Sequence, residues 1–292
     1  MFKKILKIFA ILLPLEYMSD IYFILSIISG CFLAGFVGAL TGLGGGIIVV
    51  PLLSIVLGID LNYAIGASLI SVIATSSGAA TAFLKKGITN LRIGLFLEIA
   101  TTIGAVIGAV IAVYIASKNA INIIFGSVLI FSAINGARKK RKTHSVPESR
   151  WAKRLRLNAS YEDKGKVVPY KVTNVWGGFS MMSLAGVLSG LLGIGSGALK
   201  VLAMDNIMKM PFKVSTTTSN FMIGVTAAAS AVVYLQKGYI VPEIAAPVMI
   251  GVLAGSRIGA KVLTYVDTYW LKRVFILIIT IIGIQMMYKG FK

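Results

Sequence analysis

Long hydrophobic stretches make up most of the chain, and short polar or glycine-rich breaks separate them. The first half contains five such stretches, at residues 21–41, 46–58, 62–84, 92–117 and 119–137. The second half contains five more, at residues 174–192, 197–209, 213–236, 240–265 and 269–288. A membrane-spanning helix needs ~20 apolar residues, so the second stretch of each half is too short to span alone. The pattern predicts an all-α integral membrane protein with roughly 8–10 membrane helices.

The two halves are copies of one unit. Residues 34–112 align with residues 185–263 without a gap, at a constant offset of 151 positions. Seven of the thirteen glycines in the first window coincide with glycine in the second, which is far more than chance would give. We therefore expect an N-terminal extension at residues 1–20, a transmembrane repeat at 21–137, a linker at 138–172 and a second transmembrane repeat at 173–292.

In each copy a glycine-rich run separates a long apolar segment from the short one. This arrangement predicts either a glycine-broken pair of helices or a re-entrant helix pair, followed by three long helices. Both alternatives give an odd number of crossings, so the two copies would run in opposite directions, as in inverted-repeat transporters. If the short segments were ordinary loops, the number would be even and the copies would be parallel. We expect the inverted arrangement.

Composition agrees with a membrane protein, because 57% of the residues are hydrophobic and only 13% are charged. The net charge is +19, and the segment from Arg138 to Lys171 contributes twelve basic against three acidic residues. Short basic loops mark the cytoplasmic side of multi-pass proteins. We therefore expect the cell inner (plasma) membrane, with the linker cytoplasmic and close to anionic lipid headgroups. Nucleic-acid binding is the less favoured interpretation of the same charges.

The N-terminal residues Met1–Leu15 place lysines ahead of a short apolar run, without a small-residue cleavage site after it. An interfacial helix is therefore favoured over a cleaved signal peptide. The only cysteine is Cys31 and the only histidine is His144, which argues against disulfides and metal sites. We expect no metal and no cofactor. Because the apolar segments hold no catalytic cluster, we expect no enzymatic activity.

The glycine-rich runs are the strongest candidates for a binding site. Glycine permits a positive φ and close backbone approach, and the helix that follows would offer N–H groups to an anion. The candidate residues are Gly44, Gly45 and Gly46 in the first run and Gly195, Ser196 and Gly197 in the second. The alternative is that these runs serve helix packing alone.

Hydroxyl-rich clusters follow both runs, and we consider Ser68, Thr75, Ser219 and Asn220 as further candidate substrate ligands. A hydroxyl can also bond its own helix backbone, which is the alternative role for the serines and for Thr75. The amide of Asn220 needs partners in hydrocarbon.

Charged residues inside the apolar segments are rare, and each costs ~2.5–3.5 kcal/mol at a helix centre. Lys200 follows Gly197 by three positions and is a candidate anion ligand, with snorkelling to the interface as the alternative. Arg257 is a candidate for substrate contact or for an ion pair with Glu98. Glu98 is the candidate carrier of a coupling proton, and a structural ion pair is its alternative. None of these charges recurs at the equivalent position of the other copy, so we expect the anion to lie off-centre, toward residues 195–220.

The sequence resembles the TauE/SafE family of sulfite and organosulfonate exporters, also called the 4-toluene sulfonate uptake permease family. The residues that carry the resemblance are the runs Ala34–Gly46 with Pro51 and Ala185–Gly197 with Thr216–Phe221. The family usually has a third glycine where this chain has Ser196. The resemblance implies an inner-membrane carrier of small, often sulfur-containing anions that is coupled to protons.

The expected function is a secondary transporter of a small anion, sulfite or an organosulfonate, by alternating access with a midplane site between the repeats. The chain has no ATP-binding motif, so an ion gradient would supply the energy. The alternative is an anion channel of the same fold. The expected partners are the anion, the lipid bilayer and a second copy of the chain in a homodimer, with no nucleic acid.

Overall fold

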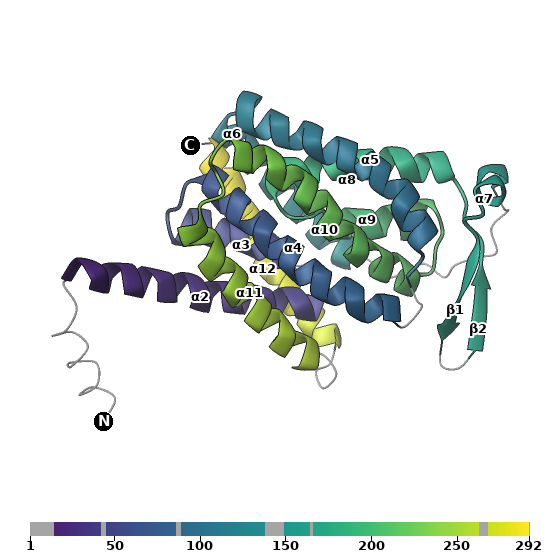
Figure 1. Ribbon diagram of the computed structural model, residues 1–292, viewed down its shortest axis with the longest axis horizontal. Coiled ribbons are helices and arrows are strands. Elements are labelled where there is room, and N and C mark those ends of the chain that lie inside the picture. The colour runs from purple at the N-terminus through teal and green to yellow at the C-terminus, as the bar shows by residue number, and fades with distance from the viewer. Residues whose placement is uncertain are drawn as a thin grey trace.

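The structure is a computed structural model that describes residues 15–41, 45–85, 89–137, 149–163, 166–262 and 268–291. In these ranges long helices form a bundle, and a small two-stranded sheet lies at one end of it (Figure 1). The first described helix extends beyond the bundle at the opposite end (Figure 1). The predicted N-terminal interfacial helix lies almost entirely outside the described residues.

The first repeat follows the predicted segments closely. Its elements are α2 (Leu15–Thr41), α3 (Gly46–Pro51) with a π-helical continuation at Leu52–Val56, α4 (Leu61–Lys85), α5 (Leu91–Val110) with a π-helical continuation at Ile111–Ile115, and α6 (Lys118–Ala137). The second repeat contains α8 (Val175–Leu192), α9 (Gly197–Leu202) with a π-helical continuation at Ala203–Ile207, α10 (Phe212–Gln236), α11 (Pro242–Val262) and α12 (Thr268–Phe291). Helices α3 and α4 begin and end 151 positions before α9 and α10, so the sequence offset is also a structural offset.

Each short helix folds back along the helix that precedes it. In the second repeat, the N–H of Thr173, just before α8, donates to the carbonyl of Met208, just after the π-helical segment, at 3.1 Å. In the first repeat, Gly30 of α2 lies directly against Leu52 at the end of α3. The end of the short helix is therefore next to the start of α8 in the second repeat and next to the middle of α2 in the first. Each long and short helix therefore form a helical hairpin, and whether that hairpin is re-entrant in the membrane stays a prediction.

The glycine-rich tips of the two hairpins meet inside the bundle. A Cβ atom added to Gly46 would lie 3.4 Å from the carbonyl oxygen of Gly193. Gly193 and Gly195 have φ values of +66° and +71°, which are favourable only for glycine. The second tip therefore needs glycine for its backbone conformation, and both tips need it for their close approach.

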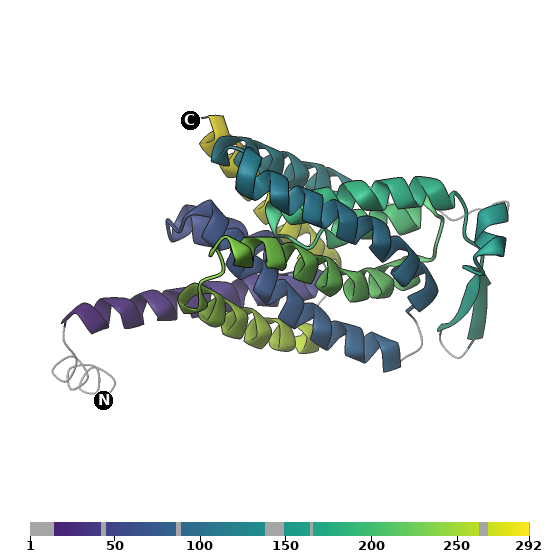
Figure 2. The ribbon, with the colours of Figure 1, turned by 45° about the horizontal axis from the view of Figure 1, so that its top comes forward.

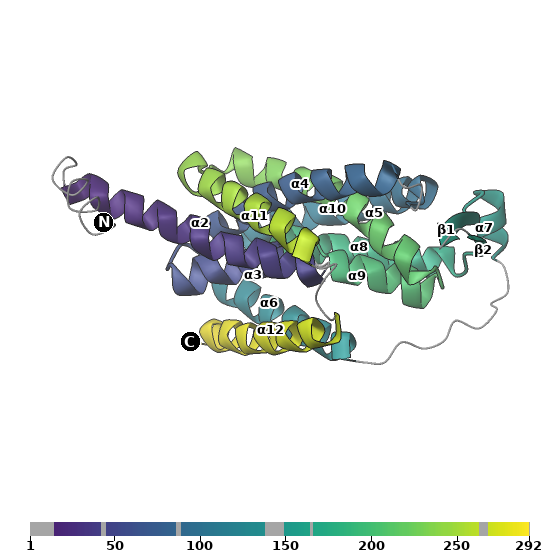
Figure 3. The same ribbon diagram turned by 90° about the horizontal axis from the view of Figure 1, so that it is seen from below.

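The two repeats interlock through their first and third long helices. Helix α2 lies against α11, and α8 lies against α5 (Figure 3). At the first contact a Cβ atom on Gly255 would be 2.0 Å from the carbonyl oxygen of Phe32. At the equivalent contact, a Cβ atom on Gly104 would be 2.2 Å from the carbonyl oxygen of Ser183. Any larger side chain at these glycines would push the helices apart, as in other small-residue helix contacts.

The equivalent helices α6 and α12 run in opposite directions. Helices α6 and α12 lie side by side (Figure 3). Gly126 of α6 contacts Gly283 of α12, whereas the later residue Gly290 contacts the earlier residue Asn119. The two helices are therefore antiparallel, which is the relation that an inverted repeat produces.

The basic linker contains structure that the sequence analysis did not predict. It forms the short helix α7 (Arg150–Arg154) and the antiparallel hairpin of β1 (Ala159–Asp163) and β2 (Lys166–Tyr170). We call residues 149–163 and 166–172 the linker cap, which lies at one end of the bundle (Figure 2). The linker cap buries three apolar side chains, those of Ala152, Leu157 and Val172. They belong to a cluster that includes Met204 and Met208 of the second repeat. The predicted all-α membrane fold is confirmed, and among the described residues this small sheet is an addition to it. The sequence did not indicate the sheet, because its apolar residues are isolated among many charges.

Helix α5 shows why the bundle belongs in a membrane. One face exposes apolar side chains at Leu95, Ile99, Ile103 and Ile107. A stripe of this kind is unfavourable in water and favourable against lipid. Four described helices are long and apolar enough to cross a membrane, in the windows Ile21–Gly38, Leu91–Ile115, Val175–Leu192 and Phe212–Gln236. Shorter apolar helices lie at Gly46–Val56, Leu61–Ser77 and Lys118–Phe131. The chain is therefore a predominantly α-helical integral membrane protein.

Candidate functional site

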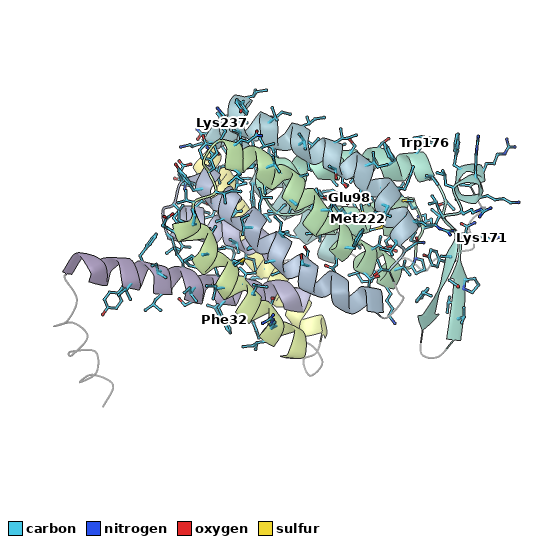
Figure 4. All side chains as sticks on the ribbon, viewed as in Figure 1. Phe32, Glu98, Lys171, Trp176, Met222 and Lys237 are labelled. Carbon is cyan, nitrogen blue, oxygen red and sulfur yellow. The ribbon has the colours of Figure 1, made fainter. Side chains whose placement is uncertain are left out.

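Three polar side chains from three helices meet in the interior of the bundle. Glu98 comes from α5, Lys200 from α9 and Thr226 from α10. Lys200 and Thr226 are fully buried, and Glu98 is 6% exposed. Figure 4 shows Glu98 and Met222, which lies one turn before Thr226, near the centre of the bundle. We call Glu98, Lys200 and Thr226 the buried polar cluster.

A chain of hydrogen bonds connects the two charged groups. The ammonium group of Lys200 donates to the hydroxyl oxygen of Thr226. The Thr226 hydroxyl donates to Oε1 of Glu98 at 2.6 Å, with the carbonyl of Met222 as a second acceptor at 2.9 Å. The hydroxyl of Thr102 donates to the same carboxylate oxygen at 3.2 Å. Thr226 therefore lies between a buried cation and a buried acid and bonds to both.

The second hairpin tip positions Lys200. The residue before α9 is Ser196, whose φ of +46° is rare for a residue with a side chain. The N–H of Lys200 donates to the carbonyl of Ser196 at 3.1 Å, which closes the first turn of α9. A Cβ atom on Gly195 would lie 2.7 Å from the side chain of Ile223 in α10. The tip thus packs tightly on α10, and Lys200 reaches Thr226 from its first turn.

Two serines at equivalent positions hold the hairpin tips. The hydroxyl of Ser68 in α4 donates to the carbonyl of Gly193 at 2.9 Å, and the carbonyl of Gly46 lies 3.4 Å away. The hydroxyl of Ser219 in α10 donates to the carbonyl of Gly197 at 3.2 Å. In this conformation both serines bond to backbone, and Ser68 joins the tips of the two copies.

Two buried oxygen atoms near the second tip lack a hydrogen-bond partner among the described residues. They are Oε2 of Glu98 and Oγ of Ser196. Buried polar atoms are nearly always hydrogen-bonded, so unpartnered ones need an explanation. Both lie on segments that meet at Lys200. A proton or a water would satisfy Oε2 of Glu98, and a water or a substrate group would satisfy Oγ of Ser196.

The structure brings some of the predicted site residues together and separates others. Gly45 and Gly46 lie at the first tip, while Gly44 is outside the described residues. Thr75 donates to the carbonyls of Ser71 and Val72 in its own helix. Asn220 is half-buried on α10. Of the predicted residues, Glu98 and Lys200 belong to the cluster, and Ser196 and Ser219 bond to the backbone of the segment that carries Lys200.

Two alternatives from the sequence analysis do not hold. Lys200 does not reach the surface, because its side chain is fully buried. Arg257 does not pair with Glu98, because its side chain is exposed on α11 and Glu98 bonds to Thr226 instead. Thr226 was not among the predicted site residues. Its only signal was the equivalence with Thr75, and nothing in the sequence distinguished the two threonines.

The described residues contain no group of three or more His, Cys, Asp or Glu side chains that could hold a metal ion. A buried cation near the tip of a helical hairpin, together with a buried acid from the other repeat, is typical of a membrane transporter. The chain belongs to the sulfite exporter TauE/SafE family of membrane transporters, whose family model matches residues 27–286.

Several relatives match this sequence over nearly their whole length. The probable membrane transporter YunE of Bacillus subtilis is 28% identical over 92% of this chain and 98% of its own. The probable membrane transporter YdhB of the same organism is 24% identical over 88% of this chain and 97% of its own. A probable membrane transporter of Methanocaldococcus jannaschii is 26% identical, over 88% and 92% respectively. No solved structure matches the chain.

Proposed function

We propose that the protein is a secondary transporter of a small anion, either sulfite or an organosulfonate, in which Lys200 binds the anion and Glu98 carries a coupled proton. The observation that carries the proposal is the fully buried Lys200, whose ammonium group shares the Thr226 hydroxyl with Glu98. A buried ammonium needs a counter-charge, and Glu98 supplies it when no substrate is bound. A bound substrate anion would supply the same counter-charge to Lys200.

The coupling follows from competition for one cation. When an anion binds to Lys200, the carboxylate of Glu98 loses its counter-charge and faces a second negative charge. A proton that binds to Glu98 then removes the repulsion, because a like charge favours the neutral form of an acid. Anion and proton therefore bind together, each strengthening the binding of the other. The net result is symport of one proton with one anion, in the direction that the gradients favour.

Alternating access would use the inverted repeats. The buried polar cluster lies beside the tip of the second hairpin, and the two tips are joined through Ser68. Movement of one repeat against the other would separate the tips and open the cluster toward one side at a time. We place the protein in the cell inner (plasma) membrane as a multi-pass protein, with the linker cap on the cytoplasmic side near anionic headgroups. A homodimer is the proposed assembly, and no catalytic activity is proposed.

The test is uptake of labelled sulfite and of a labelled sulfonate into proteoliposomes. Removal of Lys200 alone leaves a buried unpaired carboxylate, which costs ~3–5 kcal/mol and endangers folding. The double variant Lys200→Met/Glu98→Gln removes both charges and keeps similar volumes, so it should fold and lose uptake. Lys153→Gln, on the exposed surface of α7, is the control for the loss of one positive charge.

The outcomes separate the candidate functions. Saturable uptake in the wild type and in Lys153→Gln, with none in the double variant, supports the proposed carrier. Uptake by the folded double variant at the wild-type rate would show that the cluster is not the site. Unitary currents that do not saturate would favour the anion channel.

A further inference from the structure

A second group of basic and polar side chains lies outside the buried polar cluster, at the junction of the linker cap and α5. It surrounds a cavity of about 230 Å³. The lining includes Thr89, Arg92, Arg156, Asn158, Ser160 and Tyr170. Sites for drug-sized ligands usually occupy ~300–1,000 Å³, so this cavity suits a smaller molecule.

The cavity is positively charged. Arg92 lies in the first turn of α5 and Arg156 follows α7, so the two guanidinium groups come from different parts of the fold. No described residue of the lining carries a carboxylate. Burial raises the pKa of Tyr170, an effect that the hydrogen bond from Asn90 partly offsets, so its phenol adds no negative charge near neutral pH. Two arginines around a small cavity favour a ligand with several acceptor oxygens.

Two further features distinguish the lining from an ordinary surface. Oγ1 of Thr89 is buried without a hydrogen-bond partner among the described residues. Arg156 has a φ of +51°, at the position after α7 where glycine is usual. The N–H of Leu157 donates to the carbonyl of Ala152 at 2.9 Å, which is the hydrogen bond that ends such a helix. An arginine in this conformation is strained, and strain of this kind is more common at functional sites than elsewhere.

Asn90 connects the cavity to the helices of the proposed transport site. Its Oδ1 accepts from the N–H of Ile93 and caps α5, and its Nδ2 donates to the phenol of Tyr170 at 2.7 Å. Its backbone N–H donates to the hydroxyl of Thr218 in α10 at 3.1 Å. Arg92 donates to the carbonyl of Arg156 at 3.3 Å. One wall of the cavity therefore joins the linker cap, α5 and α10, and the latter two helices carry Glu98 and Thr226.

We propose that this cavity binds a small oxyanion of the phosphate or sulfate type through Arg92 and Arg156, and that the bound anion holds the linker cap against α5 and α10. The same chemistry is present in a free inorganic anion and in the phosphate of a lipid headgroup. This proposal is independent of the proposed transport function, because none of its residues belongs to the buried polar cluster.

The experiment is thermal unfolding of the delipidated protein in detergent, with sodium phosphate or sulfate added at constant ionic strength. We expect a saturable rise of several degrees in the melting temperature, since a ligand that binds only the folded state stabilises it. Arg92→Gln should lose the rise. Arg156→Gly should also lose it, although glycine relieves the positive φ and leaves the anion-free protein at least as stable as the wild type. Lys153→Gln, on the same helix but outside the lining, should keep the rise.

Two further arms identify the source of the anion and separate this site from the transport site. Short-chain phosphatidic acid is compared with short-chain phosphatidylcholine, so a rise with phosphatidic acid alone indicates a headgroup and a rise with inorganic phosphate indicates a free anion. The rise should persist in Lys200→Met/Glu98→Gln, where the proposed transport site is removed. The proposal is overturned if no anion gives a saturable rise, or if the rise is unchanged in both Arg92→Gln and Arg156→Gly.

Discussion

At the scale of single residues, the buried polar cluster departs from the symmetry of the two repeats. Thr75 and Thr226 occupy equivalent positions in the two repeats, yet only Thr226 lies between charged groups. The positions equivalent to Lys200 and Glu98 are occupied by Val49 and Met249, which are apolar. The symmetric scaffold therefore contains one asymmetric polar cluster.

This asymmetry gives a matched pair of variants. Thr226→Val keeps the shape of the side chain but removes the hydroxyl that connects Lys200 to Glu98. We expect anion uptake to fall by about tenfold or more, because a buried hydrogen bond to a charged group contributes ~1.5–3 kcal/mol. Thr75→Val removes a hydroxyl that bonds only its own helix, and uptake should stay within about twofold of the wild type. Equal losses in the two variants, measured in proteoliposomes, would contradict the role of Thr226.

Sequence reasoning identified part of this site and missed the rest for a physical reason. Lys200 and Glu98 were found because charges are rare and costly inside apolar segments. Thr226 was not selected, since a threonine in a membrane helix usually bonds its own backbone, as Thr75 does here. Arg257 is also a charge inside an apolar segment and was selected for the same reason as Lys200. Its side chain, however, lies on the exposed side of α11. Which side of a helix faces the interior of the bundle depends on its contacts with other helices. These contacts cannot be predicted from the sequence of one segment.

At the scale of elements, hydropathy predicted nearly all of the helices. Segments 62–84 and 213–236 correspond to α4 and α10 within two residues at each end, because apolar length and glycine breaks determine membrane helices. The linker cap was missed, since Leu157, Val172 and Tyr170 are scattered among charges. Their burial depends on Met204 and Met208 of the second repeat, which are distant in sequence from most of the cap.

The contact of α5 with α8 gives a prediction for a single glycine. A Cβ atom on Gly108 would lie 2.0 Å from the carbonyl oxygen of Val187, and a backbone atom cannot move aside alone. Gly108→Ala should therefore destabilise the protein by ~1–3 kcal/mol or more, as overpacking does elsewhere. At Gly94 the nearest atoms are side-chain carbons at 3.3 Å, which can shift. Thermal unfolding in detergent should show a clearly larger loss for Gly108→Ala than for Gly94→Ala, and the reverse order would contradict this packing.

At the scale of the whole molecule, the inverted arrangement predicts where equivalent residues lie relative to the membrane. Arg92 and Glu243 are exposed, begin equivalent helices and occupy positions that differ by 151. In a background of Cys31→Ala, which removes the only native cysteine, Arg92→Cys and Glu243→Cys should react with a membrane-impermeant thiol reagent from opposite sides. Labelling of both from the same side would indicate parallel repeats and would contradict the antiparallel order of α6 and α12.

The central claim is that anion and proton move together because the anion takes Lys200 from the carboxylate of Glu98, which then binds the proton. The most direct measurement follows both fluxes at once in proteoliposomes, with labelled sulfite and an internal pH indicator. The wild type should carry about one proton with each anion, and a proton gradient alone should drive accumulation of the anion. In Glu98→Gln residue 98 stays uncharged while Lys200 keeps its charge, so anion exchange by the folded variant should continue without proton movement. Wild-type sulfite flux without proton movement, or full proton coupling in Glu98→Gln, would contradict the claim.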